Sequence, residues 1–149
     1  MSKDIVPFDG YQDDRVKIPV VEHLSDDELR ELNELLPWNC FIVDSKGRRF
    51  GKPTSATKRN IPQTVPDRRI AMLNERIPLH DKTVFEIGCF EGVHTAGLIH
   101  YAKHVKACDS RISNVVKTAV RCAMFQINPS VFVWDVEQAP PAGQDVSCD

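Results

Sequence analysis

The sequence predicts an α/β fold built on a parallel β-sheet. From residue 83 onward, apolar runs typical of strands alternate with stretches typical of helices. The strands are expected at 83–88, 104–109 and 131–136, and the helices at 93–103 and 111–127. Elements that alternate in this way form parallel sheets through right-handed crossovers. Residues 145–149 have the pattern of the beginning of a fourth strand, so we expect a truncated sheet.

The stretch 111–127 has the clearest helical pattern in the sequence. Its apolar residues recur with the spacing of one helix face, and we expect that amphipathic face to be the buried one. These residues are Ile112, Val115, Val116, Ala119, Val120, Ala123 and Ile127.

Residues 1–79 are expected to form an N-terminal extension ahead of a half-domain at 80–149. A helix is predicted at 26–36, because Ser25 and Glu28 fit a capping box. A short hairpin is expected over 38–50, followed by a proline-containing irregular stretch. A second helix is expected to have Pro66 in its first turn and one buried apolar face. That face is predicted to contain Ile70, Leu73 and Ile77.

The composition is that of a soluble globular protein. Of the 149 residues, 42% are hydrophobic and 27% are charged, with a formal net charge of -2. No apolar run approaches the roughly 20 residues of a membrane helix, and the N-terminus lacks the apolar core of a signal peptide. We therefore expect a cytoplasmic protein that does not bind membranes.

The cysteines and histidines give no pattern typical of a metal site. The five cysteines are widely spaced and form no C-x-x-C pair, which disfavours a disulfide framework or a structural zinc site. His94, His100 and His104 do not share one helix face, so surface or helix-end roles are expected for them.

Charge is distributed unevenly over the first half of the chain. Residues 1–36 carry ten acidic and four basic side chains, whereas 46–69 carry eight basic side chains and the single acid Asp67. Two interpretations of the basic stretch stay open: a solvated loop, or a clamp for a phosphate-bearing substrate such as RNA or a nucleotide sugar.

The residues at the ends of the predicted strands are the most informative, because ligands of such sheets bind at the carboxyl ends of the strands. The first strand ends in Glu86-Ile-Gly88-Cys-Phe-Glu-Gly92 and leads directly into a helix. Glycines there allow a tight turn and a close approach to a ligand. Asp109 ends the second strand and could accept hydrogen bonds from a ribose, and Asp135 ends the third and could accept from an adenine amino group.

This set resembles the first three signature motifs of class I S-adenosylmethionine-dependent methyltransferases, over roughly residues 80–149. The resemblance implies a Rossmann-like sheet, with strand order 3-2-1-4 in the part present, that binds S-adenosylmethionine. It implies that the glycine loop holds the methionine part, Asp109 the ribose, Asp135 the adenine amino group and the Val136 backbone the ring edge. The cofactor-binding residues it implies are Glu86, Gly88, Cys89, Phe90, Gly92, Asp109, Asp135 and Val136.

The loop is also similar to that of the enzymes that modify wobble uridines in tRNA by carboxymethyl or methyl transfer. It departs from the family at Phe90, where many members have glycine, so this side chain must point away from the cofactor or narrow its site. Two other functions are kept as alternatives. A nicotinamide-dependent oxidoreductase would have G-x-G-x-x-G, which this loop lacks. A non-catalytic interaction module would keep only a remnant of the fold.

The methyl acceptor and the catalytic base are not identified by the sequence. Acceptor residues in the resembled family follow the fourth and later strands, so we expect this chain to be inactive by itself. Either the chain is truncated, which we favour, or a partner chain supplies the rest. An open sheet edge also predicts self-association.

Overall fold

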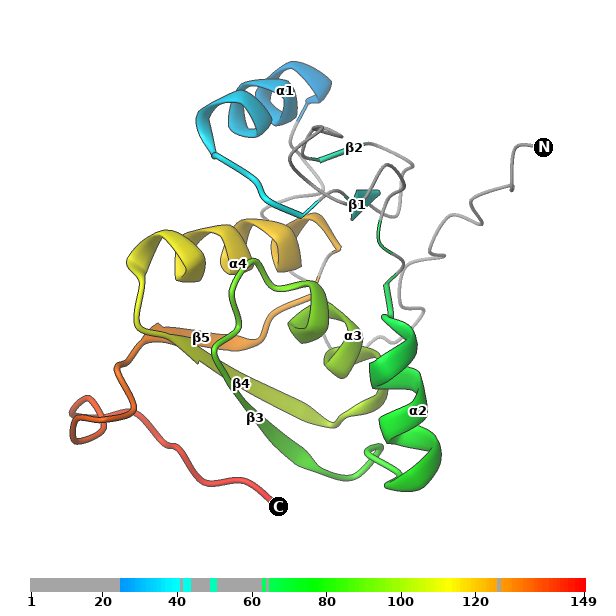
Figure 1. Ribbon diagram of the computed structural model, residues 1–149, viewed down its shortest axis with the longest axis vertical. Helices are drawn as coiled ribbons and strands as arrows, with labels where there is room; N and C mark the ends of the chain where they lie inside the picture. Colours follow the sequence, from blue (N-terminus) through cyan, green and yellow to red (C-terminus); the bar gives the residue numbers. More distant parts are fainter. Residues whose placement is uncertain (1–24, 41, 44–48, 51–62, 64, 126) are drawn as a thin grey trace.

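The computed structural model describes residues 25–40, 42–43, 49–50, 63, 65–125 and 127–149. Its main layer is a three-stranded parallel sheet in the order β3-β4-β5. The strands are β3 (Thr83–Ile87), β4 (His104–Asp109) and β5 (Ser130–Val133). They match the predicted strands closely, and the α/β class is confirmed (Figure 1).

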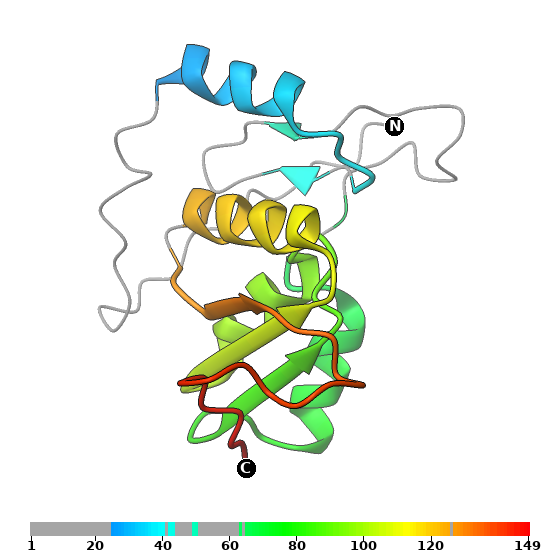
Figure 2. The ribbon, with the colours of Figure 1, turned by 90° about the vertical axis from the view of Figure 1, so that its left-hand side faces the viewer.

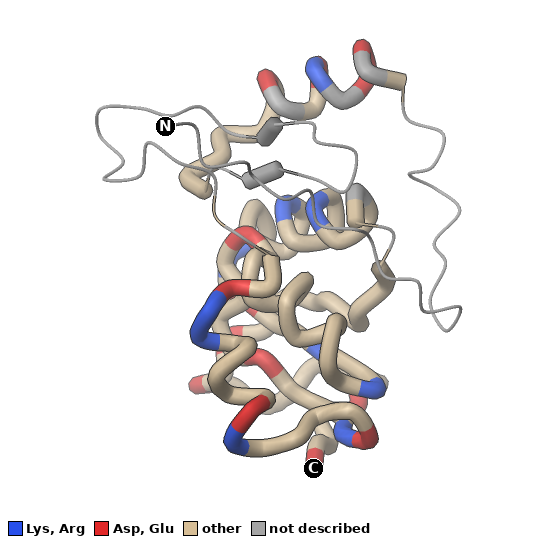
Figure 3. The backbone as a smooth tube through the Cα atoms, turned by 90° about the vertical axis from the view of Figure 1, so that its right-hand side faces the viewer, with Lys and Arg blue, Asp and Glu red and all other residues tan. Residues whose placement is uncertain are grey.

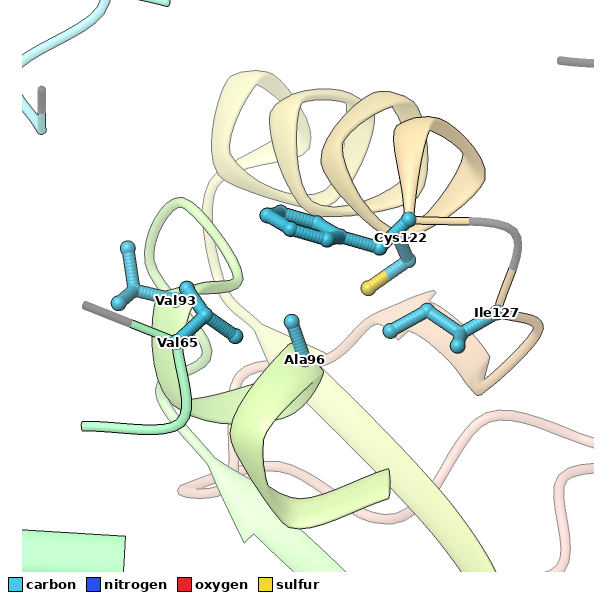
Figure 4. Packing of buried hydrophobic residues seen from close by; sticks show 6 residues of the cluster. Val65, Val93, Ala96, Cys122 and Ile127 are labelled. Carbon is cyan, nitrogen blue, oxygen red and sulfur yellow. The ribbon is translucent and has the colours of Figure 1, made fainter. Parts of the chain in front are cut away.

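Two crossover helices cover one face of this sheet: α3 (Val93–Tyr101) and α4 (Ile112–Met124). A core cluster fills the space between them, and Figure 4 shows its side chains pointing toward one another. Its buried members are Val65, Val93, Ala96, Cys122, Phe125 and Ile127. The core therefore packs the first half of α3 against the C-terminal end of α4, with Val65 of the N-terminal extension completing the cluster.

The predicted fourth strand is not formed. Residues 145–149 contain no strand, although the Asp149 N–H donates to the Thr83 carbonyl over 3.1 Å and the Thr83 N–H donates to the Asp149 carboxylate over 2.6 Å. Lys106 also contacts Asp145 over 2.6 Å. The order of the three observed strands is established, but the predicted order 3-2-1-4 is not, because the fourth strand is absent from the described residues.

The prediction for the buried face of α4 is wrong in part. Val115 is buried as expected, but Ile112 and Val116 are 64% and 42% exposed. Lys117 and Arg121 are buried instead, at 4% and 0% exposed. Lys117 contacts the buried carboxylate of Glu91 over 2.7 Å, and Arg121 lies 3.8 Å from the same carboxylate. Figure 3 colours the basic positions of the chain blue and the acidic positions red. Ionic pairing therefore overrides the apolar periodicity on this helix.

The described N-terminal elements lie on the α3 and α4 side of the sheet (Figure 2). Helix α1 (Asp26–Leu35) begins with the predicted capping box between Ser25 and Glu28. Strands β1 (Ile42–Val43) and β2 (Arg49–Phe50) pair antiparallel, which confirms the predicted hairpin. Residues 44–48 lie outside the described residues, and so does most of the irregular stretch predicted over 51–66, of which residues 63, 65 and 66 are described.

Helix α2 (Arg68–Arg76) differs from the prediction at its start and on its face. Asp67 caps it through the Arg69 N–H, so Pro66 precedes the helix and follows a cis peptide bond. Ile70 is buried against α3, whereas Leu73 and Ile77 are 39% and 51% exposed. No helix in the described part of the chain is long and apolar enough to cross a membrane.

Candidate functional site

The loop between β3 and α3 has the left-handed backbone that its glycines predict. Gly88 and Gly92 have φ angles of +78° and +75°. A Cβ on Gly92 would lie 2.9 Å from Thr118 Cγ2, so the loop packs tightly on α4 there. A Cβ on Gly88 would meet nothing within 4 Å. Space beside the backbone is therefore open at Gly88 and closed at Gly92.

A pocket of about 370 Å³ opens beside this loop. Its wall combines the glycine loop, the first turn of α3 and residues of the N-terminal extension. The lining residues are Asn39, Cys40, Gln63, Arg69, Glu86, Gly88, Cys89, Phe90, Glu91, Val93 and His94. The structure thus brings together the predicted residues Glu86, Gly88, Cys89 and Phe90 in one cavity.

Glu86 is the titratable group of greatest interest in this pocket. Thr95 Oγ1 lies 2.5 Å from Glu86 Oε2 and is the one side-chain donor to this carboxylate within the described part of the chain. Burial raises the pKa of Glu86 to about 7, and the hydrogen bond from Thr95 offsets only part of that rise. A cationic ligand next to this carboxyl group would stabilise its charged form and lower its pKa.

Phe90 has a φ of 51°, which is unusual for a residue with a side chain. Its N–H donates to Asp109 Oδ2 over 3.0 Å, and its carbonyl accepts from the Thr118 hydroxyl over 3.1 Å. Its side chain is 41% exposed and lines the pocket. Polar partners on both sides of Phe90 therefore hold this unusual backbone conformation in place.

Asp109 lies at the end of β4 as predicted, but it does not line the pocket. Its carboxylate accepts from the backbone N–H groups of Phe90 and Arg111 over 3.0 and 2.9 Å, and from Asn114 Nδ2 over 3.0 Å. A carboxylate can accept about four hydrogen bonds. Asp109 is therefore an organiser of the glycine loop in this structure, and its predicted contact to a ribose stays a prediction.

Asp135 and Val136 also lie away from the pocket. Both are exposed just beyond β5, Val136 by 45%, and Asp135 Oδ1 accepts from the Glu137 N–H over 3.2 Å. The structure places them at the carboxyl edge of the sheet but does not bring them into the cavity with Glu86. Their adenine-binding roles remain predictions.

Sequence reasoning missed the contribution of the N-terminal extension to the pocket. Arg69 Nη2 lies 2.7 Å from His94 Nε2, and Asp67 holds the same guanidinium through contacts of 2.8 and 3.2 Å. His94 was expected in a surface or helix-end role, and Arg69 as part of the basic stretch 46–69, most of which lies outside the described residues. No spacing in the sequence links α2 to the first turn of α3.

No protein-family model matches this sequence, and no curated protein matches it. Among solved structures, the N-terminal domain of EvdMO1 with SAH (S-adenosylhomocysteine) bound is similar, with a TM-score of 0.60 and 20% identity over 78% of this chain and 49% of that chain. The same domain in the presence of SAH and D-fucose gives a TM-score of 0.56 and 21% identity, over 79% and 48%. This chain thus spans about half the length of the chains it matches. The likeness confirms the predicted Rossmann-like α/β fold.

Proposed function

We propose that this chain binds S-adenosylmethionine in the pocket beside Gly88 and forms the cofactor-binding part of a methyltransferase. The observation that carries the proposal is a half-buried carboxylate, Glu86, which lines the same pocket as a glycine with open space beside it, Gly88. The fold of the SAH-bound EvdMO1 domain supports the proposal, because SAH is the demethylated form of this cofactor.

The charges of the pocket match the amino-acid end of such a ligand. That end carries an ammonium and a carboxylate, and the sulfonium of S-adenosylmethionine adds a second positive charge. Glu86 would receive the cationic groups, and Arg69 with His94 would receive the carboxylate from the other wall. Arg69 is 63% exposed at its side chain, so it can turn toward a ligand.

The carboxyl edge of the sheet suits the adenosine end. Asp109 has one lone-pair site left for a ribose hydroxyl. Ile112, Val133 and Val136 are large apolar residues that are 64%, 39% and 45% exposed near this edge. These side chains would cover the flat adenine ring. Asp135 would accept from the adenine amino group.

The bound cofactor supplies a methyl group that its positive sulfonium already activates. The chain itself has to bind and orient that group and exclude water from it. Glu86 would orient the cationic end, and the wall formed by the N-terminal extension would screen it from solvent. We assign no residue of this chain as the base that acts on the methyl acceptor.

Isothermal calorimetry with a matched glycine pair tests the proposal. We expect the chain to bind SAH and not NAD, and Gly88→Ala to abolish SAH binding because the new methyl group occupies the open space. Gly143→Ala is the control: Gly143 has a φ of +80°, and its Cβ would also meet nothing within 4 Å. NAD binding without SAH binding, or equal loss in both variants, would contradict the proposal.

A further inference from the structure

Glu91 is a second carboxylate of the glycine loop, and its surroundings differ from those of an ordinary ligand-binding group. It is fully buried, although it contributes to the pocket wall. Its oxygens accept from the Asn39 N–H over 2.9 and 3.0 Å, from Asn39 Nδ2 over 3.0 Å and from the Cys40 N–H over 2.7 Å. Lys117 Nζ adds a charged contact of 2.7 Å.

These donors use the acceptor capacity of Glu91, since a carboxylate accepts about four hydrogen bonds. A ligand in the pocket would therefore find no free lone pair on it. Its effect on binding must be exerted through the groups it holds. Those groups are the backbone of Asn39 and Cys40, which line the same pocket.

Helix α4 holds the same segment from the other side. Lys117 Nζ also donates to the Pro37 carbonyl over 2.5 Å. The Arg121 guanidinium lies 4.7 Å from the centre of the Trp38 ring and 3.8 Å from Glu91 Oε2. One carboxylate and two cations, all buried, thus fix four consecutive residues of the extension onto the loop and α4.

We propose that Glu91 is a positioning residue that locks the segment Pro37–Cys40 onto the glycine loop and so builds one wall of the ligand pocket. Locking and ligand binding are then coupled, and each strengthens the other. The ligand class, an S-adenosyl compound, rests on the function proposed above. The locking itself rests only on the contacts of Glu91, Lys117 and Arg121.

Trp38 provides a direct fluorescence signal for this segment. It is half-buried, and it follows Pro37, whose carbonyl accepts a hydrogen bond from Lys117. The Trp134→Phe background leaves it as the one tryptophan of the chain. Three variants are compared in that background: Glu91→Gln, Lys117→Gln and the control Val105→Ala. Val105 is 5% exposed in the cluster between α2, α3 and β4, outside the pocket, so its truncation destabilises the fold elsewhere.

The first measurement is acrylamide quenching of Trp38 without ligand. We expect stronger quenching in Glu91→Gln and Lys117→Gln than in the parent, and parent-like quenching in Val105→Ala. The second is SAH affinity together with the Trp38 emission change on binding. We expect Glu91→Gln to weaken affinity at least about fivefold, within the usual range of coupling between sites, and to lose the emission change. Val105→Ala should stay within about twofold.

Parent-like quenching or parent-like SAH affinity in Glu91→Gln would overturn the inference. So would an equal loss in Val105→Ala, because the effect would then follow general stability. If the parent fails to bind SAH, the proposed function fails, and quenching alone decides whether Glu91 locks the segment.

Discussion

Glu86 and Glu91 lie on the same connection between β3 and α3, yet their carboxylates have very different partners. Glu91 accepts from two backbone N–H groups, an asparagine amide and a lysine. Glu86 has Thr95 as its one side-chain donor in the described part of the chain. The comparison distinguishes a carboxylate whose acceptor sites are filled by the protein from one with a single side-chain donor, which we propose as the ligand-binding group.

Their pKa values move in opposite directions for this reason. Burial pushes the pKa of Glu91 up, but the hydrogen bonds from Lys117, Asn39 and Cys40 outweigh it, so the net shift is downward. Burial dominates at Glu86 and raises its pKa to about 7. At pH values above the ordinary pKa of a glutamate, the ionised Glu91 therefore stabilises the fold, and this stabilisation is lost as the pH falls. The protonated Glu86 favours the folded state at pH values below the ordinary pKa of a glutamate, and this stabilisation is lost as the pH rises through about 7.

The largest effect is expected from removing the cation of the fully paired carboxylate. Lys117→Met would leave Glu91 buried without its main counter-charge, which typically costs about 3–5 kcal/mol. Urea unfolding at neutral pH measures this loss, with Lys103→Met at an exposed site as the control. A loss no larger than that of Lys103→Met would mean that the ion pair does not organise the loop.

A gain in stability is expected when Glu86, the carboxylate with one side-chain donor, loses its charge. Glu86→Gln removes a charge that is unfavourable above pH 7, so it should raise the free energy of unfolding at pH 8 by up to about 3 kcal/mol. The gain should largely disappear at pH 5, where Glu86 is already protonated in the folded state. Thermal unfolding at the two pH values gives the difference. A variant that is less stable than the parent at pH 8 would show that the Glu86 charge is well compensated.

Asp109 lies between these extremes, with three donors and one lone-pair site left. Asp109→Ala should weaken SAH affinity by about 1.5–3 kcal/mol, because it removes a ribose acceptor and loosens the Phe90 N–H. Asp135→Ala should cost less, about 0.5–1.5 kcal/mol for one exposed hydrogen bond. Calorimetry ranks the two, and unchanged affinity in Asp109→Ala would remove Asp109 from the site.

The sequence predicted what depends on local pattern. Strand β4 was predicted with its observed bounds, because apolar residues run to an acid at its end. The capping box of α1 was predicted because its two partners are three residues apart. The left-handed turn of the glycine loop was predicted because glycines after a strand allow a tight turn, whereas Glu86 was included only through the resemblance to the methyltransferase family.

What the sequence could not predict depends on contacts between distant segments. Glu91 is 52 residues from Asn39 and 26 from Lys117. No spacing rule connects them, so α4 was assigned an apolar buried face and Lys117 was not singled out. The pocket wall formed by Asn39, Arg69 and His94 was missed for the same reason.

The pH dependence of S-adenosylmethionine affinity tests most directly the claim that Glu86 receives the cationic end of the ligand. Between pH 5.5 and 7.5, the parent should bind more weakly as the pH falls below about 7, approaching tenfold per pH unit, because the carboxyl must lose its proton to pair with the ligand. Glu86→Gln should bind weakly at every pH, with a flat profile. A flat profile in the parent, or parallel profiles in the two proteins, would contradict this account.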